Sequence, residues 1–255
     1  MKAIISLAIR KVPRKYLQIV SPLVMKGVKL WYKGNNYECP VCNSTYSKLL
    51  PYGRMNPREN ALCPECLSLE RHRLMWLYLK NKTNFFSQPI TLLHIAPEHC
   101  FIKRFEAMPN LNYLSADIES PLAKLKMDIH NIPLEDNSVD VVFCNHVLEH
   151  VDNDIQCMKE FYRVLKPGGW SILQSPLDPT RATTLEDPTL TTPQQREAVH
   201  GQDDHVRTYG LDYADRIRQA GFDVLEDNYV YTLSKEDVKR YALPSEEIIY
   251  VGRKK

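Results

Sequence analysis

The sequence lacks the features that mark membrane-spanning and secreted proteins. Four basic residues between positions 10 and 15 interrupt the apolar opening, so it contains no apolar run of the roughly 20 residues that cross a bilayer. The apolar run at residues 4–9 is too short for a secretory signal, and no small-residue cleavage site follows it. Repeats and low-complexity tracts are also missing. We therefore expect a globular protein located in the cytoplasm.

Acidic residues are missing from the first 37 positions, which hold eight Lys or Arg residues. The net charge of the whole chain is only +2, so overall charge gives no argument for binding nucleic acid. We favour a helical extension packed on the rest of the protein for residues 1–37. The alternative is a basic amphipathic segment, residues 1–33, that lies on an anionic membrane surface.

The composition is that of an ordinary globular protein, with 44% hydrophobic and 25% charged residues among 255. This length fits one medium domain with a small appendage. After the basic extension, residues 38–80 hold two cysteine pairs and a helical run at 67–80. A polar linker at 81–89 precedes a domain that we assign to residues 90–255.

Two Cys-x-x-Cys pairs predict a zinc site. Zn²⁺ takes four soft ligands in a tetrahedron, and a two-residue spacer lets both thiolates of a pair reach one ion. A reducing compartment also favours metal ligation over disulfides for this pattern. We assign the ion to four ligands and expect a structural role, because protein atoms fill every position: Cys39, Cys42, Cys63 and Cys66.

Short apolar strands alternate with helix-length segments from residue 90 onward, which predicts a parallel, doubly wound α/β sheet. The last two strands lie close together in the sequence, so we expect them to form an antiparallel pair at one edge. The expected strands are 91–96, 111–117, 139–144, 170–174, 222–231 and 247–252. The expected helices are 99–107, 152–165 and 211–221, with the second ended by Lys-Pro-Gly-Gly at 166–169.

Two stretches of this domain carry a family resemblance. Residues 139–151 read VDVVFCNHVLEHV, and residues 160–173 read EFYRVLKPGGWSIL. Together they resemble the class I S-adenosylmethionine-dependent methyltransferases, and the resemblance covers residues 90–175 best. It implies a Rossmann-like seven-stranded sheet with an antiparallel edge strand, preceded here by the zinc module. It also implies S-adenosylmethionine as the cofactor.

The resemblance assigns cofactor roles to residues near the strand ends. Asp117 is expected to bind the ribose hydroxyls, although it could instead cap the next helix. Asp128 is expected to bind the adenine amino group and Ile129 to pack on its ring, while Asn145 ends the strand below the methionine portion. The first motif departs from the family, because His94 replaces an acid and Ala-Pro-Glu at 96–98 replaces a glycine-rich run. We expect Ala96 to allow close approach and Glu98 to hold the cofactor's ammonium group.

Two histidines are candidate general bases for removing a proton from the methyl acceptor. His205 is the first choice and His146 the second, whereas the neighbouring Glu149 and His150 are expected to be structural. His200, Arg207 and Tyr209 lie in the same polar stretch as His205 and are predicted to contact the substrate. Alternatively, this stretch is a hydrogen-bonded lid without chemistry, or it binds Mn or Zn through His200, Asp204 and His205.

The resemblance favours methylation of a hydroxyl or amine on a small molecule, such as a sugar or glycan intermediate. Two alternatives remain open. The protein could methylate RNA and use the zinc module to grip it, because the basic opening and several arginines of the module favour a polyanion. It could also be a zinc-binding scaffold that has kept the fold and lost the cofactor.

Overall fold

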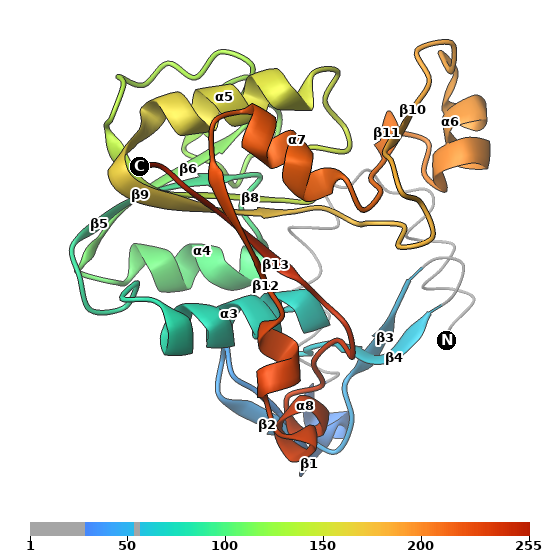
Figure 1. Ribbon diagram of the computed structural model, residues 1–255. Coiled ribbons are helices and arrows are strands. Elements are labelled where there is room, and N and C mark those ends of the chain that lie inside the picture. Colours follow the sequence, from blue (N-terminus) through green and yellow to red (C-terminus); the bar gives the residue numbers. More distant parts are fainter. Residues whose placement is uncertain (1–28, 54–56) are drawn as a thin grey trace. The chain divides into compact units, whose positions relative to one another are not determined.

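The computed structural model describes residues 29–53 and 57–255, which form two compact units (Figure 1). One unit contains the described residues up to Asn84, together with His99–Lys103 and Tyr229–Glu247. The other contains Phe85–Glu98, Arg104–Asn228 and Ile248–Lys255. The chain therefore passes from one unit to the other more than once.

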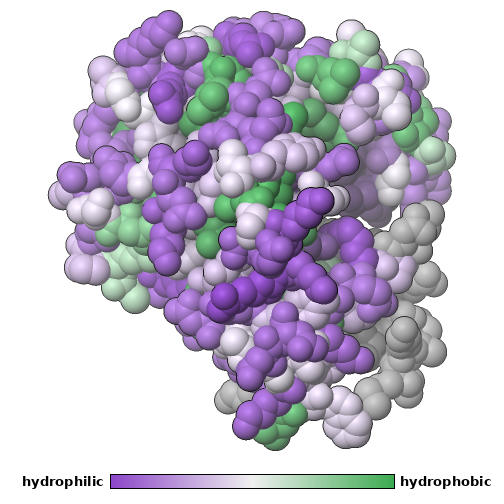
Figure 2. Space-filling model, turned by 60° about the horizontal axis from the view of Figure 1, so that its bottom comes forward, coloured by the Kyte–Doolittle hydropathy of each residue, from purple (hydrophilic) through white to green (hydrophobic). Residues whose placement is uncertain are grey.

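The expected basic extension and its membrane contact fall mainly on residues 1–28, which lie outside the described residues. Among the described residues, no helix combines the length and apolar character needed to cross a membrane. On the side shown in Figure 2 the surface is mainly hydrophilic, and hydrophobic residues appear in small separate groups. Such scattered apolar residues are normal on a protein surface.

The first unit is built from two hairpins and a helix. The strands β1 (Lys33–Cys39) and β2 (Ser44–Tyr46) pair antiparallel, as do β3 (Leu50–Tyr52) and β4 (Arg58–Leu62). They are followed by α3 (Glu70–Lys82), and the returning chain adds a short 3₁₀ helix, η1 (Tyr229–Thr232), and α8 (Lys235–Arg240). Helix α3 starts three residues later than the sequence indicates, because Leu67 has a positive φ of 61° and belongs to the preceding turn.

A buried arginine ties this unit together. Arg73 on α3 is fully buried, and its guanidinium donates hydrogen bonds to the carbonyl oxygens of Ala61 and Ser68, both at 2.9 Å. It also donates to the carbonyls of Tyr241 at 2.7 Å and Ala242 at 2.6 Å. Because a buried charge must be compensated by hydrogen bonds, Arg73 links the hairpin of β4 and the segment after α8 to one helix.

The second unit contains a seven-stranded sheet in the order β12–β13–β9–β8–β5–β6–β7. Its strands are β5 (Ile90–Ile95), β6 (Leu111–Asp117), β7 (Leu125–Lys126), β8 (Val139–Asn145), β9 (Leu165–Gln174), β12 (Asp223–Asp227) and β13 (Ile249–Arg253). Strands β5 to β9 are parallel, whereas β13 runs antiparallel to both β9 and β12. The predicted doubly wound sheet with an antiparallel pair at its edge is confirmed.

Alternation along β8 separates the two faces of the sheet. Val142 and Cys144 belong to the core that includes residues of α5 (Asp154–Val164) and α7 (Tyr213–Gln219), the two helices seen together on one face in Figure 1. Phe143 points to the other face, where it stacks on Phe85 and meets Phe105, which belongs to α4 (His99–Glu106). Both faces of β8 are therefore covered, as expected for a central parallel strand.

Several expected boundaries are wrong. The Lys-Pro-Gly-Gly stretch does not form a loop after the helix, because β9 begins at Leu165 and includes it. Gly169 fits there since a Cβ would lie 2.8 Å from the Lys166 carbonyl oxygen. The strand expected to extend to residue 231 ends at Asp227. The long loop after β9 contains α6 (Pro193–His200) and two short paired strands, β10 (Leu185–Glu186) and β11 (Arg207–Thr208).

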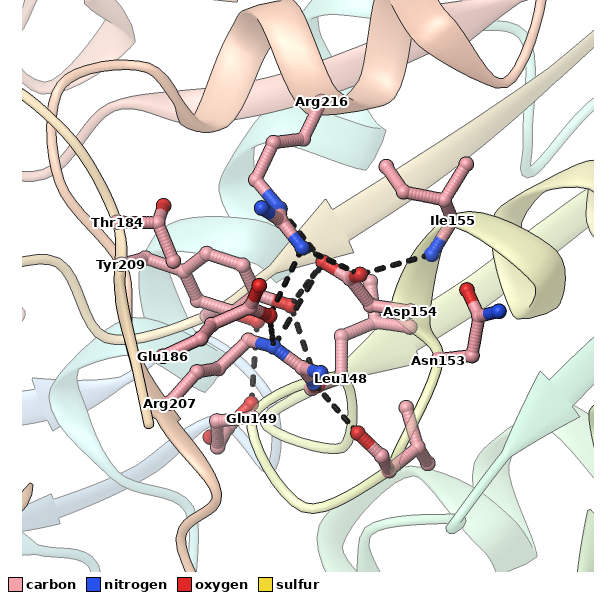
Figure 3. Close-up of polar contacts among 12 residues, drawn as sticks. Leu148, Glu149, Asn153, Asp154, Ile155, Thr184, Glu186, Arg207, Tyr209 and Arg216 are labelled. Atoms are coloured by element: carbon pink, nitrogen blue, oxygen red, sulfur yellow. Dashed lines mark hydrogen bonds and ion pairs between the residues drawn. The ribbon is translucent and has the colours of Figure 1, made fainter. Parts of the chain in front are cut away.

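Arg207 fastens this loop to the segment that follows β8 (Figure 3). Its guanidinium donates to three carbonyls of the turn, those of Leu148 at 2.5 Å, Val151 at 2.6 Å and Asp152 at 3.0 Å. The backbone N–H of Val206 adds a bond to the Glu149 carbonyl at 2.9 Å. The two segments are more than 50 residues apart in the sequence and are held in one fixed register by these bonds.

Asp154 at the start of α5 neutralises the charges of Arg207 and of a second arginine, Arg216. Its carboxylate accepts hydrogen bonds from Arg216 Nε at 2.9 Å and Nη2 at 2.7 Å, and from the Tyr209 hydroxyl at 2.8 Å. Glu186 bonds to both Arg207 and Arg216 and completes the network. Burial alone would raise the pKa of Asp154, but the hydrogen bonds from Arg216 and the charge of Arg207 hold it below its ordinary value.

Replacing Asp154 should therefore destabilise the sheet unit. We expect Asp154→Asn to lower the free energy of unfolding at pH 7 by about 3 kcal/mol, because it leaves two arginines without their buried counter-charge. The loss should shrink as the pH falls below about 4, since the depressed pKa stabilises the fold only while the carboxylate is ionised. Denaturant unfolding followed by circular dichroism measures both effects.

Asp215→Asn, which removes an exposed pair with Arg218 on α7, is the matched control. It should change stability by less than about 0.5 kcal/mol. Equal losses in the two variants would show that the Asp154 network contributes nothing special to the fold.

Candidate functional site

The four predicted metal ligands come together in the first unit. The Sγ atoms of Cys39 and Cys66 lie 3.6 Å apart, and those of Cys42 and Cys63 lie 3.7 Å apart. All four sulfurs lie within 4.8 Å of one another. Zn–S bonds of about 2.3 Å place the sulfurs of a tetrahedron about 3.8 Å apart, so the cluster fits a zinc ion.

Two left-handed turns and a serine shape this cluster. Asn43 and Leu67, which follow the cysteine pairs, have positive φ angles of 57° and 61°. Their N–H groups donate to the carbonyls of Cys39 and Cys63, four residues earlier, which closes each turn around its pair. The Ser68 hydroxyl lies 3.2 Å from the sulfurs of both Cys39 and Cys66, where it can donate to a thiolate. The module is therefore consistent with a structural zinc site.

A second group of polar residues lies at the carboxyl ends of β5 and β8. The Glu98 carboxylate bonds to Nε2 of the buried His94 at 2.5 Å and accepts a hydrogen bond from Asn145 Nδ2 at 2.9 Å. His94 is held on its other side by the Tyr113 hydroxyl at 3.0 Å. Because β5 and β8 are parallel neighbours, Glu98 bridges two adjacent strand ends. This edge of a doubly wound sheet is where such folds bind their ligands.

Ala96 makes the turn out of β5 at a left-handed backbone angle, with φ of 47°. This conformation suits glycine, and a residue with a Cβ adopts it at some energetic cost. Its N–H donates to the Ala116 carbonyl at 2.8 Å, which fixes the turn beside the end of β6. The backbone angle of a glycine motif is therefore present without the glycine.

The two predicted cofactor acids follow neighbouring strands. Asp117 ends β6, and its Oδ1 accepts hydrogen bonds from the N–H groups of Glu119 at 2.8 Å and Ser120 at 2.7 Å. Its carbonyl accepts the N–H of Met127, which places Asp128 at the same sheet edge. Asp128 is exposed and bonds to His130 through Oδ1, which lowers its pKa, while Ile129 is buried.

Histidines gather at the same edge, beside β8 and β9. His146 follows β8 with a positive φ of 55°, and its Nδ1 lies 3.5 Å from Glu149 Oε1. The Ser175 hydroxyl after β9 donates to Glu149 Oε2 at 3.1 Å. Burial alone would raise the pKa of Glu149, but His146 holds it below its ordinary value. The carboxylate is therefore ionised at neutral pH.

His205 lies against this group. Its ring packs edge-on to that of His150, with ring centres 4.7 Å apart. Burial and the charge of His150 lower the pKa of His205. The imidazole is consequently neutral near pH 7 and can accept a proton. His200 lies further along the loop, with Nδ1 2.8 Å from the Thr208 hydroxyl, and its pKa is also lowered by burial.

Comparison with known proteins identifies the sheet unit. The family "Methyltransferase domain" matches residues 92–173, which cover most of β5 and β9, the strands between them, and Asp117 and Asp128. Residues 92–173 of the sheet unit therefore match a methyltransferase family, as the resemblance to the class I S-adenosylmethionine-dependent methyltransferases predicted. The predicted recognition is thus confirmed, and the four-cysteine module lies outside the matched stretch.

Two curated methyltransferases are similar over parts of the chain. A malonyl-[acyl-carrier protein] O-methyltransferase of Marinomonas sp. (strain MWYL1) is 32% identical over 73 residues, 29% of this chain and 23% of that protein. Cycloartenol-C-24-methyltransferase 1 of Oryza sativa subsp. japonica is 30% identical over 143 residues, 51% of this chain and 39% of that protein. The chain therefore matches well under half the length of either relative.

Among solved structures, an S-adenosylmethionine dependent methyltransferase from Mesorhizobium loti superposes with a TM-score of 0.48 at 13% identity. The superposition covers 71% of this chain and 98% of that one.

In this methyltransferase domain two predicted substrate residues must be reassigned. Arg207 is only 3% exposed and its donors are used on backbone carbonyls and Glu186. Tyr209 is fully buried and bonds to Leu148 and Asp154. Both residues support the fold, so we withdraw them as substrate ligands. The roles of His200, His146 and His205 stay predictions.

Sequence reasoning underrated Glu149. This residue was expected to be structural, yet it lies between His146, Ser175 and the His150–His205 pair. The signal was available in the spacing His146–Glu149–His150 directly after a buried strand. A turn at that point gathers all three side chains at the carboxyl edge of the sheet, where chemistry takes place in this fold.

Removing one cysteine of the module should release its metal. We expect the purified protein to contain one tightly bound zinc per chain and Cys63→Ala to lose at least nine-tenths of it, because three thiolates do not complete the tetrahedron. Cys157→Ala, which changes a buried cysteine of α5, is the control and should keep its zinc. Elemental analysis of the dialysed proteins measures their zinc content. A full zinc content in Cys63→Ala would refute the assignment of the four cysteines as zinc ligands.

Proposed function

We propose that this protein transfers the methyl group of S-adenosylmethionine to a hydroxyl or amine of a small molecule. The observation that supports this most strongly is the pair of carboxylates, Asp117 and Asp128, following two adjacent strands of a methyltransferase-family sheet. Carboxylates at this edge suit the ribose hydroxyls and the adenine amino group, which are all hydrogen-bond donors. The structural zinc belongs to the four-cysteine module and takes no part in the reaction.

The bonds at each acid suggest how the cofactor is held. Asp117 is fixed through Oδ1, so we assign Oδ2 to the ribose hydroxyls. We assign Asp128 to the adenine amino group and Ile129 to the adenine ring. At the other end, the carboxylate of Glu98 supplies a negative charge near the strand ends, and we assign it to the cofactor's ammonium group. Asn145 then orients Glu98 and contacts the methionine portion.

Methyl transfer needs an aligned acceptor and, for a hydroxyl, the removal of one proton. S-adenosylmethionine, when bound, would supply an activated methyl group, and its sulfonium sulfur would keep the electrons of the C–S bond as the acceptor oxygen takes the methyl. His205, neutral near pH 7 because burial lowers its pKa, accepts the proton of the acceptor. His146 is the second candidate. We assign His200 to substrate contact, because it lies on the same loop as His205.

We propose a narrower class of methyl acceptors than the O- and C-methylation for which the relatives are named. The two curated relatives are named for an O-methylation and for a C-24 methylation, so their names do not agree on an acceptor. A base of the imidazole type favours an oxygen or nitrogen acceptor over carbon in our proposal. We expect a small polar molecule, with a sugar or glycan intermediate as the first class to test.

Binding of S-adenosylhomocysteine tests the cofactor site. We expect calorimetric titration of the full chain to give one site per chain. Asp117→Ala should weaken binding 10- to 100-fold, because it removes hydrogen bonds between a charged group and the ribose. The matched control is Asp136→Ala, an exposed acid that precedes β8 and so lies at the opposite end of the strands. An intact chain that binds no S-adenosylhomocysteine would be the non-catalytic scaffold instead.

The pH dependence of transfer tests the base. With labelled S-adenosylmethionine and a small-molecule extract, we expect an acid limb in labelling that lies below the ordinary imidazole pKa of about 6.5, because burial lowers the pKa at which His205 becomes protonated. His205→Ala should slow transfer 100-fold or more and remove this acid limb, while S-adenosylhomocysteine binding is retained. Asp215→Asn serves as the control with unchanged transfer. If His205→Ala keeps the transfer rate and the acid limb of the wild type, the base lies elsewhere. If the label appears in RNA, the methyl acceptor is RNA and not a small molecule.

A further inference from the structure

The methyltransferase sheet carries a second group of side chains that can bind a metal ion, separate from the four cysteines. Glu149, His150 and His205 each offer a ligand atom, and these atoms lie within 4.8 Å of one another. We propose that these three residues bind a divalent first-row transition-metal ion at the carboxyl edge of the sheet. Two imidazoles and a carboxylate form an N/O ligand set suited to zinc or manganese.

The chain builds this arrangement from two distant segments. Glu149 and His150 belong to the turn after β8, and His205 precedes β11. The guanidinium of Arg207 binds carbonyls of that turn (Figure 3). The N–H of Val206 binds the Glu149 carbonyl, which brings the adjacent His205 to the other two residues. The site is therefore held by a buried network and does not depend on the chance position of a surface loop.

Neighbouring groups orient the proposed ligands. The Asp204 carbonyl lies 3.2 Å from Nδ1 of His150, so this nitrogen can donate its proton and leave Nε2 as the metal ligand. The Ser175 hydroxyl holds one oxygen of Glu149. Supporting contacts of this kind are typical of metal-binding histidines and carboxylates.

Asp204 adds a second negative charge beside the three proposed ligands. Its Oδ2 lies 3.5 Å from His150 Nδ1. Its Oδ1 is buried and has no hydrogen-bond partner among the described residues. A divalent ion would be balanced by Glu149 and Asp204, while the two imidazoles bind in their neutral forms.

This assignment corrects the metal alternative drawn from the sequence. That alternative grouped His200, Asp204 and His205, but His200 instead bonds to Thr208. Three protein ligands leave a coordination position for a water or an acceptor oxygen. This last point rests on the proposed function: His205 is the base of the chain without this ion, and His146 takes that role once the ion occupies His205.

Manganese titration of the full, zinc-loaded chain tests the site. Mn²⁺ prefers imidazole and carboxylate to thiolate, so it reports on this site without displacing zinc from the cysteines. We expect electron paramagnetic resonance of free Mn²⁺ to show one ion bound per chain. His150→Ala and His205→Ala should each raise the dissociation constant at least 10-fold. His130→Ala, a histidine outside the cluster, should stay within about 2-fold of the wild type.

A variant that fails to fold would also lose its metal, so the folding of each variant is measured separately. His150 is only part-buried, so His150→Ala should keep the circular dichroism spectrum and the cysteine-bound zinc. Asp204→Asn provides a second, milder variant with the same direction of effect. The proposal is overturned if the wild type shows no saturable Mn²⁺ or second Zn²⁺ binding below about 1 mM, or if His130→Ala loses as much affinity as His150→Ala. Titration of the same zinc-loaded chain with S-adenosylhomocysteine, without added Mn²⁺, distinguishes failure of this site from failure of the cofactor site.

Discussion

The hydrogen bonds of one guanidinium decide the geometry of the sheet's carboxyl edge. Arg207 donates to three carbonyls of the turn after β8, and Asp154 with Glu186 compensates its charge. The turn and the loop could otherwise be placed independently, since more than 50 residues separate them. Because this contact is buried and closely packed, a small change in its geometry shifts the side chains of both segments.

A different constraint acts at the end of β5. The family uses glycine there for close backbone approach, but this chain places alanine at a left-handed angle and follows it with Pro97 and Glu98. Glu98 then reaches across to Asn145 and back to His94. We propose that Glu98 supplies the negative charge that the family carries on the strand, four residues after the position that His94 occupies here. Cofactor binding in this protein depends on that exchange being tolerated.

The sequence was sufficient where the signal is local. Apolar runs located four of the five parallel strands to within a few residues except at the start of β9, whereas the two-residue β7 was not expected. The spacing of the cysteines predicted a cluster that the structure brings together. The end of the 111–117 strand also indicated where Asp117 would lie, because side chains after parallel strands share one edge, whereas Asp128 was assigned by the family resemblance. Each of these features follows from residues close together in the chain.

Contacts between residues that lie far apart in the chain could not be predicted from the local sequence. Arg207 and Tyr209 look like an exposed polar group by composition, and only the fold shows that Asp154, more than 50 residues away, buries them. Similarly, Lys-Pro-Gly-Gly has the sequence of a helix stop, yet its glycines form an irregular strand start because Lys254 pairs with Gly168 and Gly169. Tertiary pairing outweighs local preference at these positions.

The central claim is that one edge of the sheet holds S-adenosylmethionine between the ends of β5, β6 and β8. Hydrogen exchange of the full chain, followed by mass spectrometry with and without S-adenosylhomocysteine, tests it most directly. The account predicts slower exchange in peptides covering residues 94–98, 117–120 and 128–131, with the cysteine module unchanged. Protection confined to other segments, or none at saturating ligand, would contradict it.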